Sequence, residues 1–462
     1  MTDVLIAAAA LALLMLAAYR GLSVIVIAPL LAMLAVFVTD PVQVPAAFSG
    51  LFMDKVASFL KLYFPVFLLG ALFGKLVETA GFSRAIVAAT VRFLGAGRAI
   101  PAIVAVTALL TYGGVSVFVA VFAVYPFAAE MFRRADIPKR LVPATIGLGA
   151  LTFTMDALPG TPQIQNIIPT SFFGTTAWAA PGLGLAGSVL ILTAGLFYLD
   201  RRRRALAGEG YGADLVNEPD TPADVPLVHP LVALAPLLVV GVSNLLLTSA
   251  IPRVFGEEAT LALGQAGEAA RVAVRPLAAI WAVEGALLLG IAAILLTAWR
   301  PVARAFAEGS RVAVAGALLA AMNTAVEYGF GGVIAALPGF AAIRGALAAI
   351  PDPLVNEAVT VTALSGITGS ASGGLSIALA AMAEQFAAAG DAAGIPREVL
   401  HRVASMASGG MDTLPHNGAV ITLLAVTGLT HRQAYRDIFA LTLIKTAAVF
   451  AVIGLHYATG LV

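Results

Sequence analysis

The chain has 462 residues, of which 60% are hydrophobic and only 11% are charged, with a mean hydropathy of +0.95; a soluble domain carries roughly 25% charged residues. The formal net charge of +1 gives no reason to expect a nucleic-acid partner, and the absence of cysteine excludes disulfides and thiolate metal sites. Apolar stretches of roughly twenty residues recur, the length that a helix needs to cross the hydrocarbon core, so the composition predicts an all-α polytopic membrane protein.

The predicted membrane spans are long apolar runs, and the first begins close to the start of the chain. Asp3 precedes that run and no basic region does, so we interpret it as a span, with a cleaved signal peptide as the alternative. Together with the segments described below, the runs predict about ten full spans. They lie at residues 4–19, 22–38, 59–77, 179–199, 229–249, 276–298, 312–328 and 437–458.

Two further apolar segments are too long for a single crossing, and glycine interrupts each of them near its middle. The first covers residues 100–132 and has Gly113 and Gly114 at its centre, and the second covers residues 355–388 with a tip that begins near Gly369. Two apolar limbs joined at a glycine-rich tip predict a re-entrant hairpin. Close helix packing through small residues is the alternative explanation for these glycines.

Positive charge in the short loops predicts which side of the membrane each loop faces, because Lys and Arg accumulate on the cytoplasmic side. A consistent orientation puts both termini outside, and brings the first hairpin in from the cytoplasm and the second from the outer side. Residues 205–228 then form a cytoplasmic linker between a first half, residues 1–204, and a second half, residues 229–462. The basic residues that lead to this orientation are Arg20, Arg92, Arg98, Arg133 to Arg140, Arg201 to Arg204, Arg300, Arg304, Arg432 and Arg436.

The two halves contain matching motifs in the same order. The sequence "FTMDALPGTPQ" in the first half reappears as "GGMDTLPHNGA" in the second, which pairs Asp156 with Asp412. Halves that match in sequence and lie oppositely in the membrane form an inverted-topology repeat, an architecture of secondary transporters. The other matched pairs, at nearly the same separation along the chain, are Ser116 with Ser376, Pro138 with Pro396 and Glu78 with Glu327.

Both repeated motifs are predicted to break a membrane helix, one near residues 141–176 and the other near residues 397–429, with non-helical backbone at 156–166 and 412–418. Pro159, Pro162 and Pro415 remove backbone donors, and non-helical backbone at membrane depth lines a cavity or packs against protein. Half-helix N-termini attract anions, so we predict a substrate site, with a surface turn between two spans as the alternative. The predicted substrate-binding residues are Gly113, Gly114, Ser116, Thr161, Gln163, Asn166, Ser372, Gly373, Ser376, His416 and Asn417.

Three carboxylates in these motifs are candidates for ion coupling, because ionisable groups at membrane depth usually serve a transport pathway or a proton relay. They are Asp156, Asp412 and Glu327. Capping of the broken helices is the alternative role for the two aspartates. We expect a proton as the coupling ion, with sodium as the alternative, and we expect no cofactor.

At these residues the chain resembles the gluconate permease family of the ion-transporter superfamily. The resemblance covers nearly the whole length and rests on "MDALPGTPQIQNIIPTSFFGT", "EYGFGGVIAALPGF" and "MDTLPHNGAVITLL", which look most like the 3-hydroxybutyrate permease branch. It implies a multi-pass protein of the bacterial inner membrane that imports small hydroxy acids, usually with protons. It also implies a homodimer with an elevator-like motion. The segments that match the family's binding regions are Gly113 to Ser116, Asp156 to Asn166, Ser372 to Ser376 and Asp412 to Gly418.

One departure from the family bears on the substrate. The sugar-acid permeases have a segment rich in His and Pro at the first break, whereas this chain has "LPGTPQ" there and keeps only His416, at the second break. Neither break nor hairpin tip contains Lys or Arg, and two helix N-termini, each worth roughly half a positive charge, balance one carboxylate. We therefore expect a small hydroxylated monocarboxylate such as 3-hydroxybutyrate, with gluconate or another sugar acid as the alternative.

Two other functions are open to a chain of this kind. A sodium-coupled carboxylate transporter would use the same architecture with another ion. An intramembrane aspartyl protease is a remote alternative, because such enzymes resemble one another in Tyr-Asp and Gly-x-Gly-Asp motifs on intact helices, whereas Asp156 and Asp412 each follow Met and precede a Leu-Pro pair. The sequence therefore predicts a transporter of a small organic anion and not an enzyme.

Overall fold

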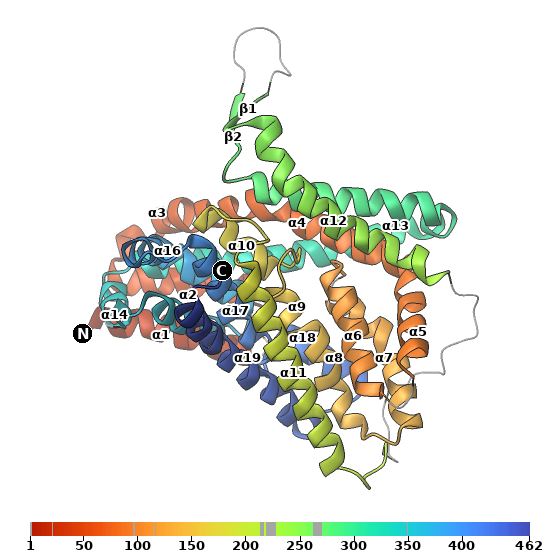
Figure 1. The fold of residues 1–462 in the computed structure, drawn as a ribbon. Helices are drawn as coiled ribbons and strands as arrows, with labels where there is room; N and C mark the ends of the chain where they lie inside the picture. The colour runs from red at the N-terminus through yellow and green to blue at the C-terminus, as the bar shows by residue number, and fades with distance from the viewer. Residues whose placement is uncertain are drawn as a thin grey trace.

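The computed structural model of the chain describes residues 2–20, 22–95, 98–115, 117–212, 217–218, 228–261, 270–348 and 350–462. Ser116, one of the predicted binding residues, lies outside the described residues, as does most of the linker at 205–228. Among the described residues only β1 (Glu258–Leu261) and β2 (Ala270–Ala273) are strands, and they pair antiparallel in a hairpin that extends away from the helical body (Figure 1). Most of the remainder is helical, which confirms the predicted all-α class.

The first part of the chain forms long helices where apolar runs were predicted. The predicted span at 59–77 is longer than expected, because helical turns begin at Pro41 and continue into the main helix up to Thr79. The elements are α1 (Thr2–Tyr19), α2 (Val24–Thr39), η1 (Pro41–Gln43), α3 (Val44–Ala46), the π-helical η2 (Ala47–Phe52), α4 (Met53–Thr79) and α5 (Phe82–Leu94).

The first hairpin and the first broken helix follow α5. Two helical limbs pack against one another around a turn at Gly113 to Val115, and the helix that follows them is interrupted twice before it resumes at Ile164. The elements are α6 (Ala99–Tyr112), α7 (Val117–Arg134), η4 (Lys139–Leu141), α8 (Val142–Ala150), α9 (Phe153–Asp156), α10 (Ile164–Phe173) and α11 (Pro181–Ala205).

The second part of the chain repeats this order of elements. A long helix, a short helix, a two-limbed hairpin, a broken helix and a final long helix occur in the same succession as α4 to α11. The elements are α12 (Pro230–Phe255), α13 (Ala278–Ala336), α14 (Pro338–Ala348), α15 (Pro353–Thr368), α16 (Ala371–Ala393), α17 (Arg397–Gly409), η5 (Gly410–Thr413), α18 (Gly418–Thr427) and α19 (His431–Thr459). The opposite orientation of the two halves stays a prediction.

The two spans predicted at 276–298 and 312–328 meet directly at a kink. The sequence placed Arg300 and Arg304 in a loop between them, but α13 (Ala278–Ala336) consists of two helices joined at Ala298. Its backbone departs from helical geometry only at Ala298 (φ −138°, ψ 34°), just before Pro301, whose ring cannot fit against the carbonyl one turn earlier. The segment after the kink is rich in alanine, the strongest helix former, so a kink replaces the expected loop.

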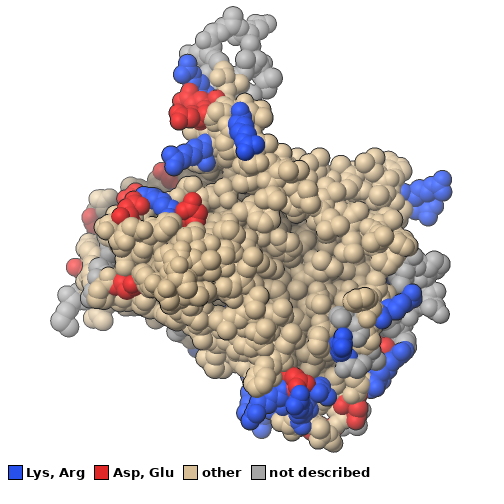
Figure 2. Space-filling model, viewed as in Figure 1, with Lys and Arg blue, Asp and Glu red and all other residues tan. Residues whose placement is uncertain are grey.

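Five of the described helical segments are long and apolar enough to cross a membrane. They are Pro41–Thr79, α11, α12, α13 and α19, and shorter apolar helices lie at Asp3–Leu14, α2, α6 and α18. The face drawn in Figure 2 is almost free of charge across its middle, while Lys and Arg gather where α11 ends and around the β-hairpin. The chain is therefore a multi-pass membrane protein, and the total of about ten spans stays a prediction.

The broken helices lie in the interior of the bundle. In Figure 1, α9, α10 and α17 are in the middle of the body, between the first hairpin with α8 on one side and α16 on the other. The long helix α13 packs against both α4 and α12 across one side, and α11 packs against α19. This arrangement brings both repeated motifs to the same region.

Candidate functional site

The first break is non-helical over Ala157 to Gln163, and its own side chains hold it in place. Gly160 has a left-handed φ of +77°, and a Cβ there would collide with the Trp178 indole. Thr161 Oγ1 donates to the Thr154 carbonyl at 2.7 Å, and Asn166 Nδ2 donates to the Thr161 carbonyl at 3.0 Å. Both side chains are fully buried. The two predicted binding residues therefore satisfy the backbone that proline and glycine leave without helical partners.

Two boundaries at this break differ from the prediction of a non-helical segment from Asp156 to Asn166. Asp156 is the last residue of the short helix α9, and Gln165 and Asn166 already belong to α10. The reason is local: Pro159 and Pro162 exclude helix only where they stand and just before them, whereas the sequence from Ile164 onward has no such residue until Pro169.

The second break is shorter and ends in a capped helix. Gly410–Thr413 forms a 3-10 turn, the chain is non-helical from Leu414 to Asn417, and α18 begins at Gly418. Asn417 caps α18, because its Oδ1 accepts the Ala419 N–H at 2.8 Å. Its Nδ2 donates to the Gly369 carbonyl at 2.9 Å, which ties the break to the tip of the second hairpin.

Each hairpin tip contacts the break of its own half. At the first tip, Gln163 Nε2 donates to the Thr111 carbonyl at 2.8 Å and the Tyr112 hydroxyl donates to the Pro159 carbonyl at 2.9 Å. Gly114 also belongs to this contact: its φ is +91°, and a Cβ there would lie 3.4 Å from the Pro162 ring. Gly113 packs instead against Leu237 of α12.

At the second tip the contacts are charged. Asp412 Oδ1 accepts the Ala371 N–H, at the start of α16, at 2.9 Å. The His416 imidazole packs against Gly369, whose φ of +68° and lack of a side chain both permit the contact. The exposed N–H groups and the dipole at a helix N-terminus attract negative charge, so the start of α16 is a suitable neighbour for the Asp412 carboxylate.

The serines predicted at the second tip have different surroundings. Ser372 Oγ lies 3.3 Å from Thr324 Oγ1 of α13, at the edge of the tip. Ser376 is fully buried, and its hydroxyl donates to the Ser372 carbonyl one turn back in the same helix at 2.7 Å. The Ser376 hydroxyl is therefore used within α16, whereas the Ser372 hydroxyl faces α13.

Glu327 of α13 lies against this tip. Its side chain is 3% exposed, and a Cβ on Gly373 would collide with its carboxylate, so the glycine makes room for the acid. Within the described residues, Glu327 Oε2 has no hydrogen-bond partner. An ionised carboxylate without a partner away from water is costly, so Glu327 differs from Asp412 in having no fixed compensation.

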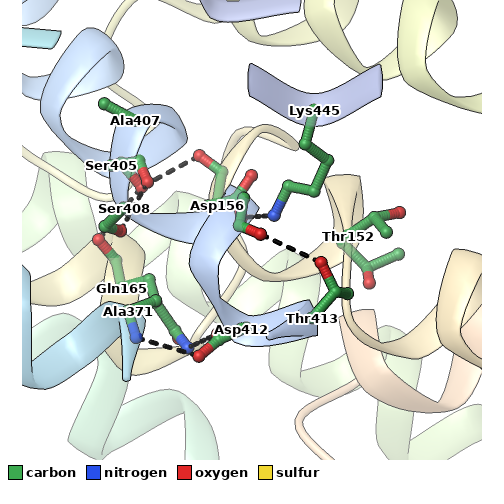
Figure 3. Close-up of polar contacts among 12 residues, drawn as sticks. Thr152, Asp156, Gln165, Ala371, Ser405, Ala407, Ser408, Asp412, Thr413 and Lys445 are labelled. Atoms are coloured by element: carbon green, nitrogen blue, oxygen red, sulfur yellow. Dashed lines mark hydrogen bonds and ion pairs between the residues drawn. The ribbon is translucent and has the colours of Figure 1, made fainter. Parts of the chain in front are cut away.

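Hydrogen bonds join the two breaks directly, as Figure 3 shows. Gln165 Nε2 donates to Asp412 Oδ2 at 2.8 Å, and Ser405 Oγ donates to the Asp156 carbonyl at 2.9 Å and to the Gln165 carbonyl at 3.0 Å. Residues more than two hundred positions apart thus share one buried polar cluster. The second aspartate also accepts from Asn417 Nδ2 at 3.2 Å, which gives its carboxylate three donors in all.

Two basic residues that sequence reasoning missed complete the cluster. Lys445 of α19 forms an ion pair with Asp156 Oδ2, and the two side chains are 1% and 0% exposed. Arg402 of α17 is also fully buried and donates to the Asp156 carbonyl at 2.8 Å, to Asn166 Oδ1 at 2.9 Å and to the Ala179 carbonyl at 2.7 Å. A lysine inside the predicted span 437–458 was the available signal, because basic residues at membrane depth are rare.

Other ionisable residues are placed as follows. Lys75 of α4 pairs with Glu78 at 3.0 Å in a partly exposed position. Glu357 of α15 is fully buried, and neither carboxylate oxygen has a hydrogen-bond partner within the part of the chain that the structure describes. Among those residues no group of three or more His, Cys, Asp or Glu could hold a metal ion.

Comparisons with known proteins agree with this picture of a membrane transporter. No protein-family model matches the chain. The chain is 58% identical to the uncharacterized transporter YxjC of Bacillus subtilis (strain 168), over 100% of both proteins. The crystal structure of the Alcanivorax borkumensis YdaH transporter has a similar fold, with a TM-score of 0.54 and 17% identity over 90% of each chain. The chain therefore belongs to the same transporter family as YxjC, and it is a transporter rather than a protease or another enzyme.

Proposed function

We propose that the chain imports a small hydroxylated monocarboxylate, such as 3-hydroxybutyrate, by proton symport. The observation that carries the proposal is the buried cluster in which two broken helices and a hairpin tip meet, Asp412 accepting from Gln165 and from the Ala371 N–H. Membership of the gluconate permease family and of its 3-hydroxybutyrate branch belongs to this proposal. So do the bacterial inner membrane, a homodimer and an elevator-type motion.

The charge balance of the cluster favours a substrate with one carboxylate. Lys445 is neutralised by Asp156, and the Arg402 guanidinium donates to carbonyl and amide oxygens on every side. Neither cation is left for a substrate that brings two or three negative charges. The N-termini of α10 and α18 each offer roughly half a positive charge, which suits a single carboxylate. Gln163, at the start of α10, and His416, just before α18, are the candidate partners for a hydroxyl.

The partners of the three candidate carboxylates favour Glu327 as the proton carrier. Asp156 has Lys445 as a counter-ion, and Asp412 has three hydrogen-bond donors. Glu327 has a buried oxygen without a partner among the described residues. An ionised carboxylate without a partner is costly away from water, and a carrier must be able to hold and release the proton during the cycle.

Uptake by proteoliposomes tests the proposal. An inward proton gradient without sodium should drive accumulation of labelled 3-hydroxybutyrate, and unlabelled 3-hydroxybutyrate, lactate and gluconate should compete more strongly than succinate or citrate. Stronger competition by citrate or succinate would show that the charge argument is wrong. Gluconate as the strongest competitor would favour the sugar-acid alternative, and loss of uptake on sodium removal would favour the sodium-coupled one.

A further inference from the structure

The two repeated aspartates differ in how their charge is compensated. Asp156 pairs with the Lys445 ammonium, whereas among the described residues Asp412 accepts from two side-chain amides and one backbone N–H. The helix that would supply the matching cation in the first half is α11, and it contains no Lys or Arg before Arg201. A repeat that is otherwise matched element by element is therefore asymmetric at its most strongly charged position.

The site around the ion pair is shaped to hold it. Gly409, the last residue of α17, lies so close that a Cβ there would collide with both the Asp156 carboxylate and the Lys445 ammonium. The second Asp156 oxygen, Oδ1, has no hydrogen-bond partner among the described residues. Arg402 adds a further positive charge by binding the Asp156 carbonyl at 2.8 Å. In Figure 3 the Lys445 side chain reaches down from its helix to the Asp156 carboxylate.

We propose that Lys445 is a built-in cation that occupies the first break in place of a mobile ion. A buried carboxylate beside a broken helix needs a positive partner, because an unpaired ion away from water is costly. Free carbonyl groups at the end of a half-helix also favour a cation. In this chain the cations are side chains of the protein itself: Lys445 forms the ion pair with the carboxylate, and Arg402 donates to the carbonyl. The mobile ion then acts only in the second half, and this assignment rests on the proposed ion-coupled function.

Removal of the Lys445 ammonium should leave a vacant cation site. Lys445→Ala removes the cation and its side-chain volume but leaves the Asp156 carboxylate, its free Oδ1 and the space beside Gly409. A small monovalent cation can then take the vacated place. The variant should bind sodium at this site. The unchanged protein should not, because the Lys445 ammonium already occupies the site.

Thermal unfolding of the purified full-length protein in detergent measures this directly. Lys445→Ala should show a saturable rise in Tm of about 2 °C or more in NaCl over KCl, because a ligand that binds only the folded state stabilises it. The unchanged protein and Lys75→Ala, which removes a lysine from a partly exposed ion pair, should show no such difference. Asp156→Asn/Lys445→Ala should lose the sodium effect, because the anion is gone.

A sodium effect in Lys445→Ala no larger than in the unchanged protein, or equally large in the double variant, would overturn the proposal. If Lys445→Ala does not fold, Lys445→Gln and Asp156→Asn/Lys445→Gln replace it. Lys445→Gln should then show the sodium-dependent rise in Tm, and Asp156→Asn/Lys445→Gln should not. The Tm readout needs no transport, so the proposed substrate or coupling can fail while the built-in cation stands.

Discussion

The substitution of Arg402 by alanine offers the sharpest test of how the first break is held in place. The Arg402 side chain is fully buried, and its guanidinium donates to the Asp156 and Ala179 carbonyls and to Asn166 Oδ1. The Ala179 carbonyl receives two of these donations, from Nε at 3.2 Å and from Nη2 at 2.7 Å. Arg402 therefore fixes three separate points of the chain around the break.

The expected loss of stability depends on which hydrogen-bond donors remain for each of the three acceptors. After Arg402→Ala, the Asp156 carbonyl retains Ser405 Oγ, and Asn166 Oδ1 retains His401 Nε2 at 3.3 Å. The Ala179 carbonyl loses both of its side-chain donors, and an orphaned buried acceptor costs about 1–3 kcal/mol. Each weakened acceptor loses a hydrogen bond to a charged group, worth about 1.5–3 kcal/mol. Allowing for local relaxation, we expect a loss of about 3–5 kcal/mol, comparable with breaking a buried ion pair.

Apparent Tm in detergent is the assay, and Arg397→Ala is the matched control. Arg397 lies on the same helix, α17, but its ion pair with Asp391 is exposed (41% and 53%), and such pairs contribute at most about 1 kcal/mol. Arg402→Ala should lower Tm by about 5 °C, and Arg397→Ala by about 1 °C or less. Equal shifts for the two variants would refute the idea that Arg402 clamps the break.

Three further predictions concern coupling, packing and orientation. Glu327→Gln should abolish proton-driven accumulation in proteoliposomes while substrate exchange continues; accumulation at the unchanged level would clear Glu327 of a carrier role. Gly373→Ala should lower uptake about tenfold or more, because its Cβ would collide with the Glu327 carboxylate. Gly316→Ala, with nothing within 4 Å of the new Cβ, is the control, and equal rates for the two would contradict the packing argument. The chain has no cysteine, so single cysteines at Arg134 and Arg397 can be labelled selectively, and they should react from opposite sides of the membrane; labelling from one side would exclude inverted halves.

Sequence reasoning located the helix breaks and hairpin tips because their causes are local. Proline removes a donor and glycine permits a left-handed turn wherever they stand, so Pro162 and Gly369 mark irregular backbone without knowledge of their neighbours. The same reasoning overestimated how far the first break extends, because a helix can restart directly after a proline. It also expected a loop around Arg300, where the alanine-rich chain continues as helix after a kink.

The partners of the motif residues could not be predicted, because they come from distant parts of the chain. Lys445 meets Asp156 across 289 positions, and Gln165 meets Asp412 across 247. Polar residues in the motif were expected to face a substrate, yet Thr161 mainly satisfies the backbone of its own break. Any polar side chain buried in so apolar a chain needs a hydrogen-bond partner. The fold determines whether that partner is a ligand, a carbonyl group or a side chain from the other half.

The contacts between the two halves of the chain also bear on how the site could open first to one side of the membrane and then to the other. Alternating access by rocking one half against the other would separate Gln165 from Asp412, Ser405 from the Asp156 carbonyl and Lys445 from the Asp156 carboxylate. Even at about 1 kcal/mol for each neutral hydrogen bond, and several times that for the buried ion pair, the separation would cost at least about 5 kcal/mol. An elevator-type motion keeps both breaks together and moves the intact cluster past helices outside it, so none of these contacts has to break. The buried polar network therefore supports the proposed elevator-type motion over a rocking motion, because an elevator would carry a substrate and these residues across as one unit.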